Sequence, residues 1–172
     1  MYSVAFVDKV TSNKNVIDYY SKDEIKLSGE NRKIIILNAE SDKMAYTDIK
    51  EKDVLSIEDD INGDQVRTIY VTRDVMEATL KSVSVQGNEY IFEINNSDFT
   101  LSNMEHRQAL YEKISTGEGY SFYRDITGKI VAAIMLQGKY RYAYVVNTGY
   151  DDREENLILE VFEPDDSNEG AS

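Results

Sequence analysis

Four side chains that carry oxygen ligands stand close together in one short stretch of the chain. Asp59, Asp60, Asn62 and Asp64 surround Gly63, and carboxylate and amide oxygens are the ligands that Ca²⁺ prefers. The glycine is not placed as in an EF-hand loop, and no glutamate follows at the position of the bidentate ligand. The composition therefore favours a hydrophilic hairpin tip, and a calcium site on these four side chains is the alternative.

A second pattern of possible chemistry is a row of tyrosines. Tyr140, Tyr142 and Tyr144 alternate with other residues, so in a strand all three lie on one face. Such a row can stack on sugar rings or receive a partner protein. Burial against another sheet is the commoner fate of alternating tyrosines, and ligand binding by Tyr140, Tyr142 and Tyr144 is the competing hypothesis.

The numbers of histidines and cysteines exclude most other kinds of reactive centre. His106 is the only histidine and cysteine is absent, which excludes histidine triads, multi-histidine zinc sites, thiolate ligands and disulfides. Pairs of Asp and Glu are plentiful, but nothing marks one of them by a raised pKa or a pocket. We therefore predict no catalytic residue, no enzyme activity and no cofactor, and keep a hydrolase with a carboxylate pair as the least favoured hypothesis.

The charge of the chain restricts its partners. The 172 residues carry a formal net charge of −13, and no apolar run is long enough to span a bilayer. A protein that neutralises phosphates or anionic lipids needs a basic face. We expect neither a nucleic-acid partner nor membrane insertion.

Two hairpins organise the elements that must position these side chains. The stretch 120–136 has an aromatic arm and an Ile/Val-rich arm on either side of Asp125-Ile126-Thr127-Gly128, where Gly128 allows a positive φ and Asp125 can hydrogen-bond forward into the turn. Residues 54–71 repeat this design around Gly63. Further strands are expected at 3–10, 15–20, 33–38 (a buried strand), 78–85, 89–94, 138–146 and 157–162, with a polar connector at 148–156. Residues 22–27 alternate charged side chains with Ile25 and Leu27 before a turn.

Two short helices are also expected. Residues 47–50 suit a single turn with Thr47 as its cap, and 102–114 suit a helix with Ser102 as its cap and Glu105 at capping-box spacing. The fold predicted is all-β with minor α: small barrel-like or sandwich-like units in tandem, with one short helix in the second. The expected division is 1–76 for the first unit, 77–147 for the second, 148–163 for a closing loop and strand, and 164–172 for a disordered tail or linker.

Two stretches carry a resemblance to a known family. Residues 48–57 (Asp-Ile-Lys-Glu-Lys-Asp-Val-Leu-Ser-Ile) and residues 120–130, with their Asp-x-x-Gly-Lys-Ile turn, resemble the repeated β modules of Clostridium-type surface proteins. Those modules accompany S-layer-homology or copper-amine-oxidase-like domains in large exported chains. The resemblance implies a non-catalytic structural or interaction module at the cell surface, cut from a larger exported protein. Its expected partners are the other domains of that protein and cell-wall or other polysaccharide. A carbohydrate-binding module that uses surface tyrosines is the alternative.

Overall fold

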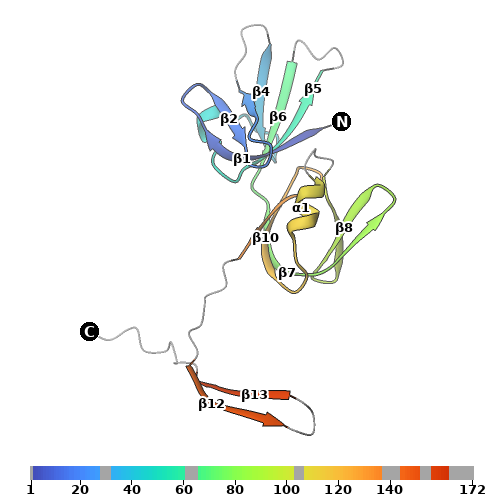
Figure 1. The fold of residues 1–172 in the computed structure, drawn as a ribbon. Coiled ribbons are helices and arrows are strands. Elements are labelled where there is room, and N and C mark those ends of the chain that lie inside the picture. Colours follow the sequence, from blue (N-terminus) through green and yellow to red (C-terminus); the bar gives the residue numbers. More distant parts are fainter. Residues whose placement is uncertain are drawn as a thin grey trace, which may run out of the picture. The chain divides into compact units, whose positions relative to one another are not determined.

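The computed structural model describes residues 2–27, 32–60, 66–102, 107–136, 144–151 and 156–162, the last two ranges by their backbone alone. The described part is mostly β-strand with one short α-helix, which confirms the predicted fold class (Figure 1). The chain divides into two compact units, residues 1–136 and 137–172. The first unit holds a six-stranded and a five-stranded sheet, and the second holds a two-stranded sheet.

The first half of the first unit forms the six-stranded sheet. Its strands are β1 (Ser3–Val10), β2 (Asn15–Asp18), β3 (Glu24–Lys26), β4 (Lys33–Asn38), β5 (Val54–Asp59) and β6 (Val66–Thr72), in the order β3-β2-β1-β5-β6-β4. All neighbours are antiparallel except β4 and β6, which are parallel. The strand predicted at 33–38 forms, but the prediction that it is buried is wrong. β4 lies at an edge of the sheet, and Ile36 is its only buried residue.

The five-stranded sheet follows directly along the chain. Its strands are β7 (Val75–Gln86), β8 (Glu89–Ile94), β9 (Ser97–Thr100), β10 (Gly119–Arg124) and β11 (Ile130–Met135), in the order β11-β10-β7-β8-β9. Beyond β9, Leu101 forms a single parallel bridge to Ile130 at the start of β11. The sheet therefore curls, but neither it nor the six-stranded sheet closes into a barrel within the part of the chain described.

The two predicted hairpins form. β10 and β11 pair antiparallel from Tyr120↔Met135 to Arg124↔Ile130, and Gly128 takes a φ of 82°, as the turn requires. β5 and β6 pair from Val54↔Thr72 to Asp59↔Arg67. The tip around Gly63 lies outside the described residues.

The described helical segments end before the residues at which the sequence suggested they would end. α1 covers Arg107–Lys113 and a single 3₁₀ turn, η1, covers Tyr46–Asp48. Thr47 lies inside that turn, so its predicted role as the cap is wrong; the Asp48 carboxylate instead accepts from the Ala45 N–H at 3.1 Å. The start of the predicted helix at 103–106 lies outside the described residues. No helix in the described ranges has the length and apolar character needed to cross a bilayer.

The second unit is a hairpin of β12 (Tyr144–Asp151) and β13 (Asn156–Phe162). The two strands pair antiparallel from Tyr144↔Phe162 to Asp151↔Asn156. Residues 148–151, predicted as part of a connector, are therefore strand. Their backbone pairing with β13 continues the register of the hairpin.

The two sheets of the first unit share a core. Phe6 of β1 and Val54 of β5 belong to the same buried cluster as Leu80, Phe92 and Phe122 of the five-stranded sheet. A separate cluster, which includes Val7, Val16, Leu55 and Ile69, fills the six-stranded sheet. Residue 76, where we expected the first unit to end, lies in β7 just after the chain passes from one sheet to the other.

Candidate binding groove beside Asp18

The predicted calcium ligands are only partly described. Asp59 is held by two guanidinium groups: Arg67 Nε lies 2.7 Å and Arg32 Nη1 3.2 Å from its Oδ1. The hydrogen bond from Arg67 keeps the pKa of the Asp59 carboxyl below its usual range. Asn62 and Asp64 lie outside the described residues, and in the described ranges no group of three or more His, Cys, Asp or Glu could hold a metal ion. The calcium site stays a prediction.

The tyrosine row cannot be placed as a surface. Tyr140 and Tyr142 lie outside the described residues, and Tyr144 is described only as the first residue of β12. His106 also lies outside them. Ligand binding by Tyr140, Tyr142 and Tyr144 therefore stays a prediction as well.

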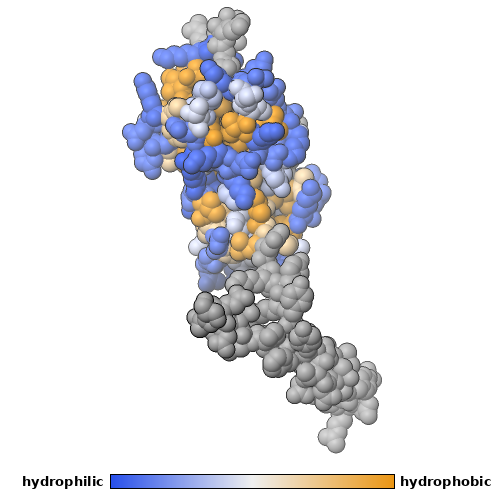
Figure 2. Space-filling view, turned by 90° about the vertical axis from the view of Figure 1, so that its left-hand side faces the viewer, coloured by the Kyte–Doolittle hydropathy of each residue, from blue (hydrophilic) through white to orange (hydrophobic). Residues whose placement is uncertain are grey.

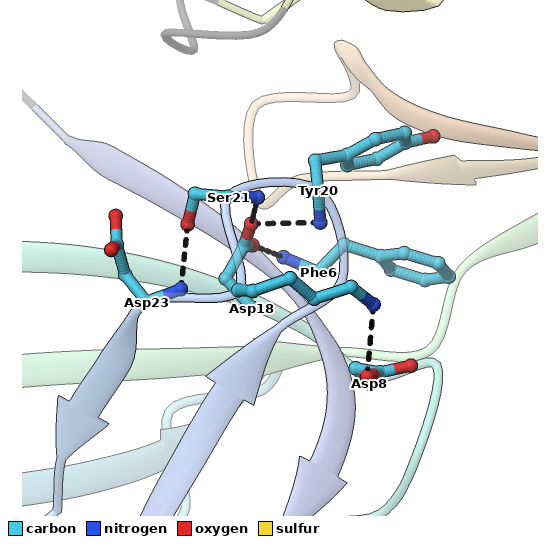
Figure 3. A network of polar contacts seen from close by, with 7 residues as sticks. Phe6, Asp8, Asp18, Tyr20, Ser21 and Asp23 are labelled. Atoms are coloured by element: carbon cyan, nitrogen blue, oxygen red, sulfur yellow. Dashed lines mark hydrogen bonds and ion pairs between the residues drawn. The ribbon is translucent and has the colours of Figure 1, made fainter.

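Asp18, which sequence reasoning did not single out, organises a turn at the end of β2 (Figure 3). Its Oδ1 accepts from the backbone N–H groups of Tyr20 at 3.0 Å and Ser21 at 2.8 Å, and its Oδ2 accepts from the Phe6 N–H at 2.9 Å. The side chain is buried, with the residue 3% exposed. A buried carboxylate needs such donors, so Asp18 fixes the turn against β1.

Backbone bonds complete this turn. The Tyr19 N–H donates to the Phe6 carbonyl at 2.7 Å, and the Lys22 N–H donates to the Asp18 carbonyl at 3.0 Å. Lys22 takes a φ of 63°, which reverses the chain toward β3. Tyr19, Tyr20 and Lys22 are thus presented from a backbone held at both ends.

These three side chains line a groove of about 360 Å³ in the first unit. Its other walls come from the end of α1 and from β10 and β11. The lining residues are Tyr19, Tyr20, Lys22, Leu110, Lys113, Ile114, Tyr120 and Ala133.

The aromatic wall of the groove is tightly packed. The rings of Tyr19 and Tyr20 meet edge to face with centroids 5.1 Å apart, and Phe6 contacts Tyr19 at 5.5 Å behind them. Burial raises the pKa of Tyr20 well above its usual range, while a hydrogen bond with the backbone of Ala133 acts in the opposite direction. Tyr20 is therefore a neutral phenol at all physiological pH values, and Tyr19, 40% exposed, is the ring open to solvent.

Two further buried carboxylates serve turns in the same way. Asp53 accepts from the Lys50 N–H at 2.9 Å and from the guanidinium of Arg73 at 2.8 and 3.0 Å. Asp125 accepts from Thr127 and Lys129 in its own turn and from the Ser102 hydroxyl at 2.8 Å. The predicted forward hydrogen bonds of Asp125 are confirmed.

A larger groove of about 740 Å³ lies where loops of both sheets meet. It is lined by Asn38, Ala39, Glu40, Met44, Val71, Thr72, Arg73, Asp74, Asp125, Ile126, Thr127 and Gly128. Its polar groups hold the fold: the Thr72 hydroxyl donates to the Arg124 carbonyl at 2.8 Å, and Asp74 pairs with the Arg124 guanidinium at 2.8 Å. The polar side chains of this groove therefore connect the two sheets, and we do not choose it as the candidate ligand site.

The one face drawn in Figure 2 presents no single broad apolar surface. On the face drawn in Figure 2, apolar residues form patches that hydrophilic residues separate. Large contiguous apolar patches are the usual mark of protein interfaces. The groove beside Asp18 combines an exposed ring with two lysines and is the candidate site that the described residues support best.

Sequence reasoning missed this groove for an identifiable reason. It placed Tyr19 and Tyr20 in the strand expected at 15–20, but the strand β2 ends at Asp18. The signal that could have found the turn is Asp18 itself, because an Asp side chain often accepts from the backbone N–H two residues on, here that of Tyr20. Comparisons with protein-family models, with curated proteins and with solved structures find no match to this chain.

Proposed function

We propose that this chain is a non-catalytic structural or interaction module of a bacterial cell-surface protein of the S-layer type. The observation that carries the proposal is the interlock between the two sheets of the first unit. Phe6 of β1 packs against Tyr123 of β10, with ring centroids 4.7 Å apart, inside a core that both sheets share.

The connection between the sheets is held by polar bonds as well. Thr72 at the end of β6 donates its hydroxyl to the Arg124 carbonyl, and the Arg124 N–H donates to the Asp74 carbonyl at 3.1 Å. The Ile126 N–H reaches the Ser56 hydroxyl of β5 at 3.4 Å. A connection fixed at several points makes the two sheets move as one body, which suits a spacer in a long extracellular chain.

The use of the buried carboxylates supports the same role. Asp18, Asp53 and Asp125 are each surrounded by donors from their own turns or from a neighbouring loop. Carboxylates used in this way stabilise turns. The repeated hairpin design, the formal charge of −13 and the resemblance of residues 48–57 and 120–130 to surface-protein modules support the location.

Location is tested by protease treatment of intact cells. The source bacterium is treated with proteinase K with and without prior lysis, and the chain is followed with an antibody raised against it. A surface module is degraded in intact cells, while a cytosolic marker survives until lysis. Survival of the chain together with the marker would contradict the proposal.

Rigidity is tested separately by hydrogen exchange of the full chain. Thr72→Val removes the hydroxyl that donates to the Arg124 carbonyl while it keeps the shape of the side chain. We expect exchange at the β6–β7 connection to quicken several-fold, with Thr100→Val on the edge strand β9 as the matched control. Equal exchange in the two variants would remove the argument for an interlocked pair of sheets.

A further inference from the structure

The groove beside Asp18 has a charge opposite to that of the chain. Its described lining residues include two lysines, Lys22 and Lys113, and no carboxylate, although the chain has 32 acidic and 19 basic residues. Two ammonium groups on one small groove raise the local concentration of anions. The described lining therefore offers positive charge to an anionic ligand.

Lys22 is positioned before any ligand arrives. Its Nζ lies 3.0 Å from Asp8 Oδ2 and 4.8 Å from the centre of the Tyr19 ring. An ammonium has three N–H donors, so the bond to Asp8 leaves two for a ligand. Because the Lys22–Asp8 pair is exposed, it contributes little on its own, and an anion can share the ammonium at little cost.

The remaining lining is apolar and of the size that holds a small molecule. Leu110, Ile114 and Ala133 provide aliphatic surface beside the exposed ring of Tyr19, and about 360 Å³ lies in the range of small-molecule pockets. Apolar and aromatic walls with a few polar groups fit a sugar ring, whose C–H faces pack on aromatic carbon while its charged substituent meets the lysines.

We propose that the groove beside Asp18 binds a saccharide ring that carries a carboxylate or a phosphate. Lys22 and Lys113 pair with the anionic group, and Tyr19 contacts the face of the ring. The residues that form this groove are not those of the predicted row at Tyr140, Tyr142 and Tyr144. It goes beyond the spacer role, because a spacer does not need to bind a ligand.

The test is an NMR titration of the full ¹⁵N-labelled chain. Trigalacturonate supplies sugar carboxylates and glucose 6-phosphate supplies a sugar phosphate; maltotriose and glucose are their neutral counterparts. Variants Lys22→Gln and Lys113→Gln each remove one charge from the groove, and Tyr19→Leu removes the ring. Lys81→Gln is the control, because Lys81 lies on β7, pairs with Glu93 and does not line the groove. The amide spectrum of each variant reports whether it is folded.

We expect saturable shifts at the amides of 19–22 and 110–114 with at least one anionic sugar and none with its neutral counterpart. The anionic sugar that produces the shifts identifies whether the groove binds a carboxylate or a phosphate. Each groove variant should weaken binding at least five-fold, and Lys81→Gln should leave it unchanged. No saturable shift with either anionic sugar, equal binding of the neutral sugar, or equal weakening by Lys81→Gln would each overturn the proposal. None of these results would bear on the proposed cell-surface location or on the proposed rigidity of the module, which have their own tests.

Discussion

The Asp18 turn gives the sharpest prediction about stability. Replacing Asp18 with Asn keeps the size and shape of the side chain but removes its charge and one acceptor oxygen. The carboxylate serves three buried or half-buried N–H groups, on Phe6, Tyr20 and Ser21. An amide has only one oxygen, so its NH₂ group must face a backbone donor on one side.

The cost follows from which donor loses its acceptor. If the amide oxygen stays with Tyr20 and Ser21, the Phe6 N–H faces another donor in the interior, where Phe6 is fully buried. A hydrogen bond to a charged group contributes about 1.5–3 kcal/mol, and a buried donor left unpaired costs a similar amount. We expect Asp18→Asn to lower the free energy of unfolding by about 3 kcal/mol, since the two bonds that remain also lose their charge.

The assay is urea denaturation of the full chain followed by far-UV circular dichroism. With a slope near 2 kcal/mol/M, a loss of about 3 kcal/mol moves the midpoint down by about 1.5 M. Asp23→Asn is the matched control. Asp23 lies in the same loop, and its backbone N–H donates to the Ser21 hydroxyl, a bond that the substitution leaves in place. An exposed substitution of that kind should stay within about 0.5 kcal/mol.

Hydrogen exchange at Phe6 provides an independent reading of the same variant. Its amide should exchange faster in Asp18→Asn than in the parent chain, because the acceptor at 2.9 Å is gone. Equal midpoints for the Asp18 and Asp23 variants, with unchanged exchange at Phe6, would refute the assignment of Asp18 as the organiser of this turn.

Three further predictions follow from the other polar contacts. Arg73→Lys should lower the free energy of unfolding by about 1 kcal/mol in urea denaturation, because an ammonium cannot reproduce the bidentate hydrogen bonds of the guanidinium to Asp53. An unchanged free energy would mean that Asp53 does not need the bidentate pair. Because the folded-state pKa of Asp59 is lowered, its stabilising contribution is fully present above the unfolded value near 4 and is lost as pH falls through the folded value. The stability difference between the parent and Asp59→Asn should therefore shrink between pH 6 and pH 2, and a constant difference would contradict the role of the charge. Gly128→Ala should lower the free energy of unfolding by about 1 kcal/mol, because alanine is strained at a φ of 82°. Gly128→Asn should lower it less in the same assay, and equal losses for the two variants would contradict strain as the cause.

Local chemistry made part of the fold predictable. The turn from Asp125 to Gly128 was readable because its hydrogen bonds and its positive φ involve residues at most four apart. The cap of η1 was misassigned because Asp48 reaches back to the Ala45 N–H, a competing local bond that the sequence does not rank above Thr47.

Contacts between distant residues explain what the sequence did not reveal. The groove brings Tyr19 next to Leu110 and Ala133, and no periodicity within one segment reports that meeting. The edge position of β4 depends in the same way on its pairing with β6, because a run of β-branched residues is compatible with a central or an edge strand. Sequence patterns thus predicted most strands and the pairing within the two hairpins, but not which strands distant in the sequence become neighbours.

The parallel pairing of β4 with β6 also has a consequence for the order of folding. β4 is made before the β5–β6 hairpin, yet β6 is its only partner in the six-stranded sheet. Until β6 has emerged from the ribosome and paired with β5, the run Ile34-Ile35-Ile36-Leu37 has no strand to join. Newly made chains therefore pass through a stage in which this apolar run has no partner in its own sheet and is open to pairing with other chains.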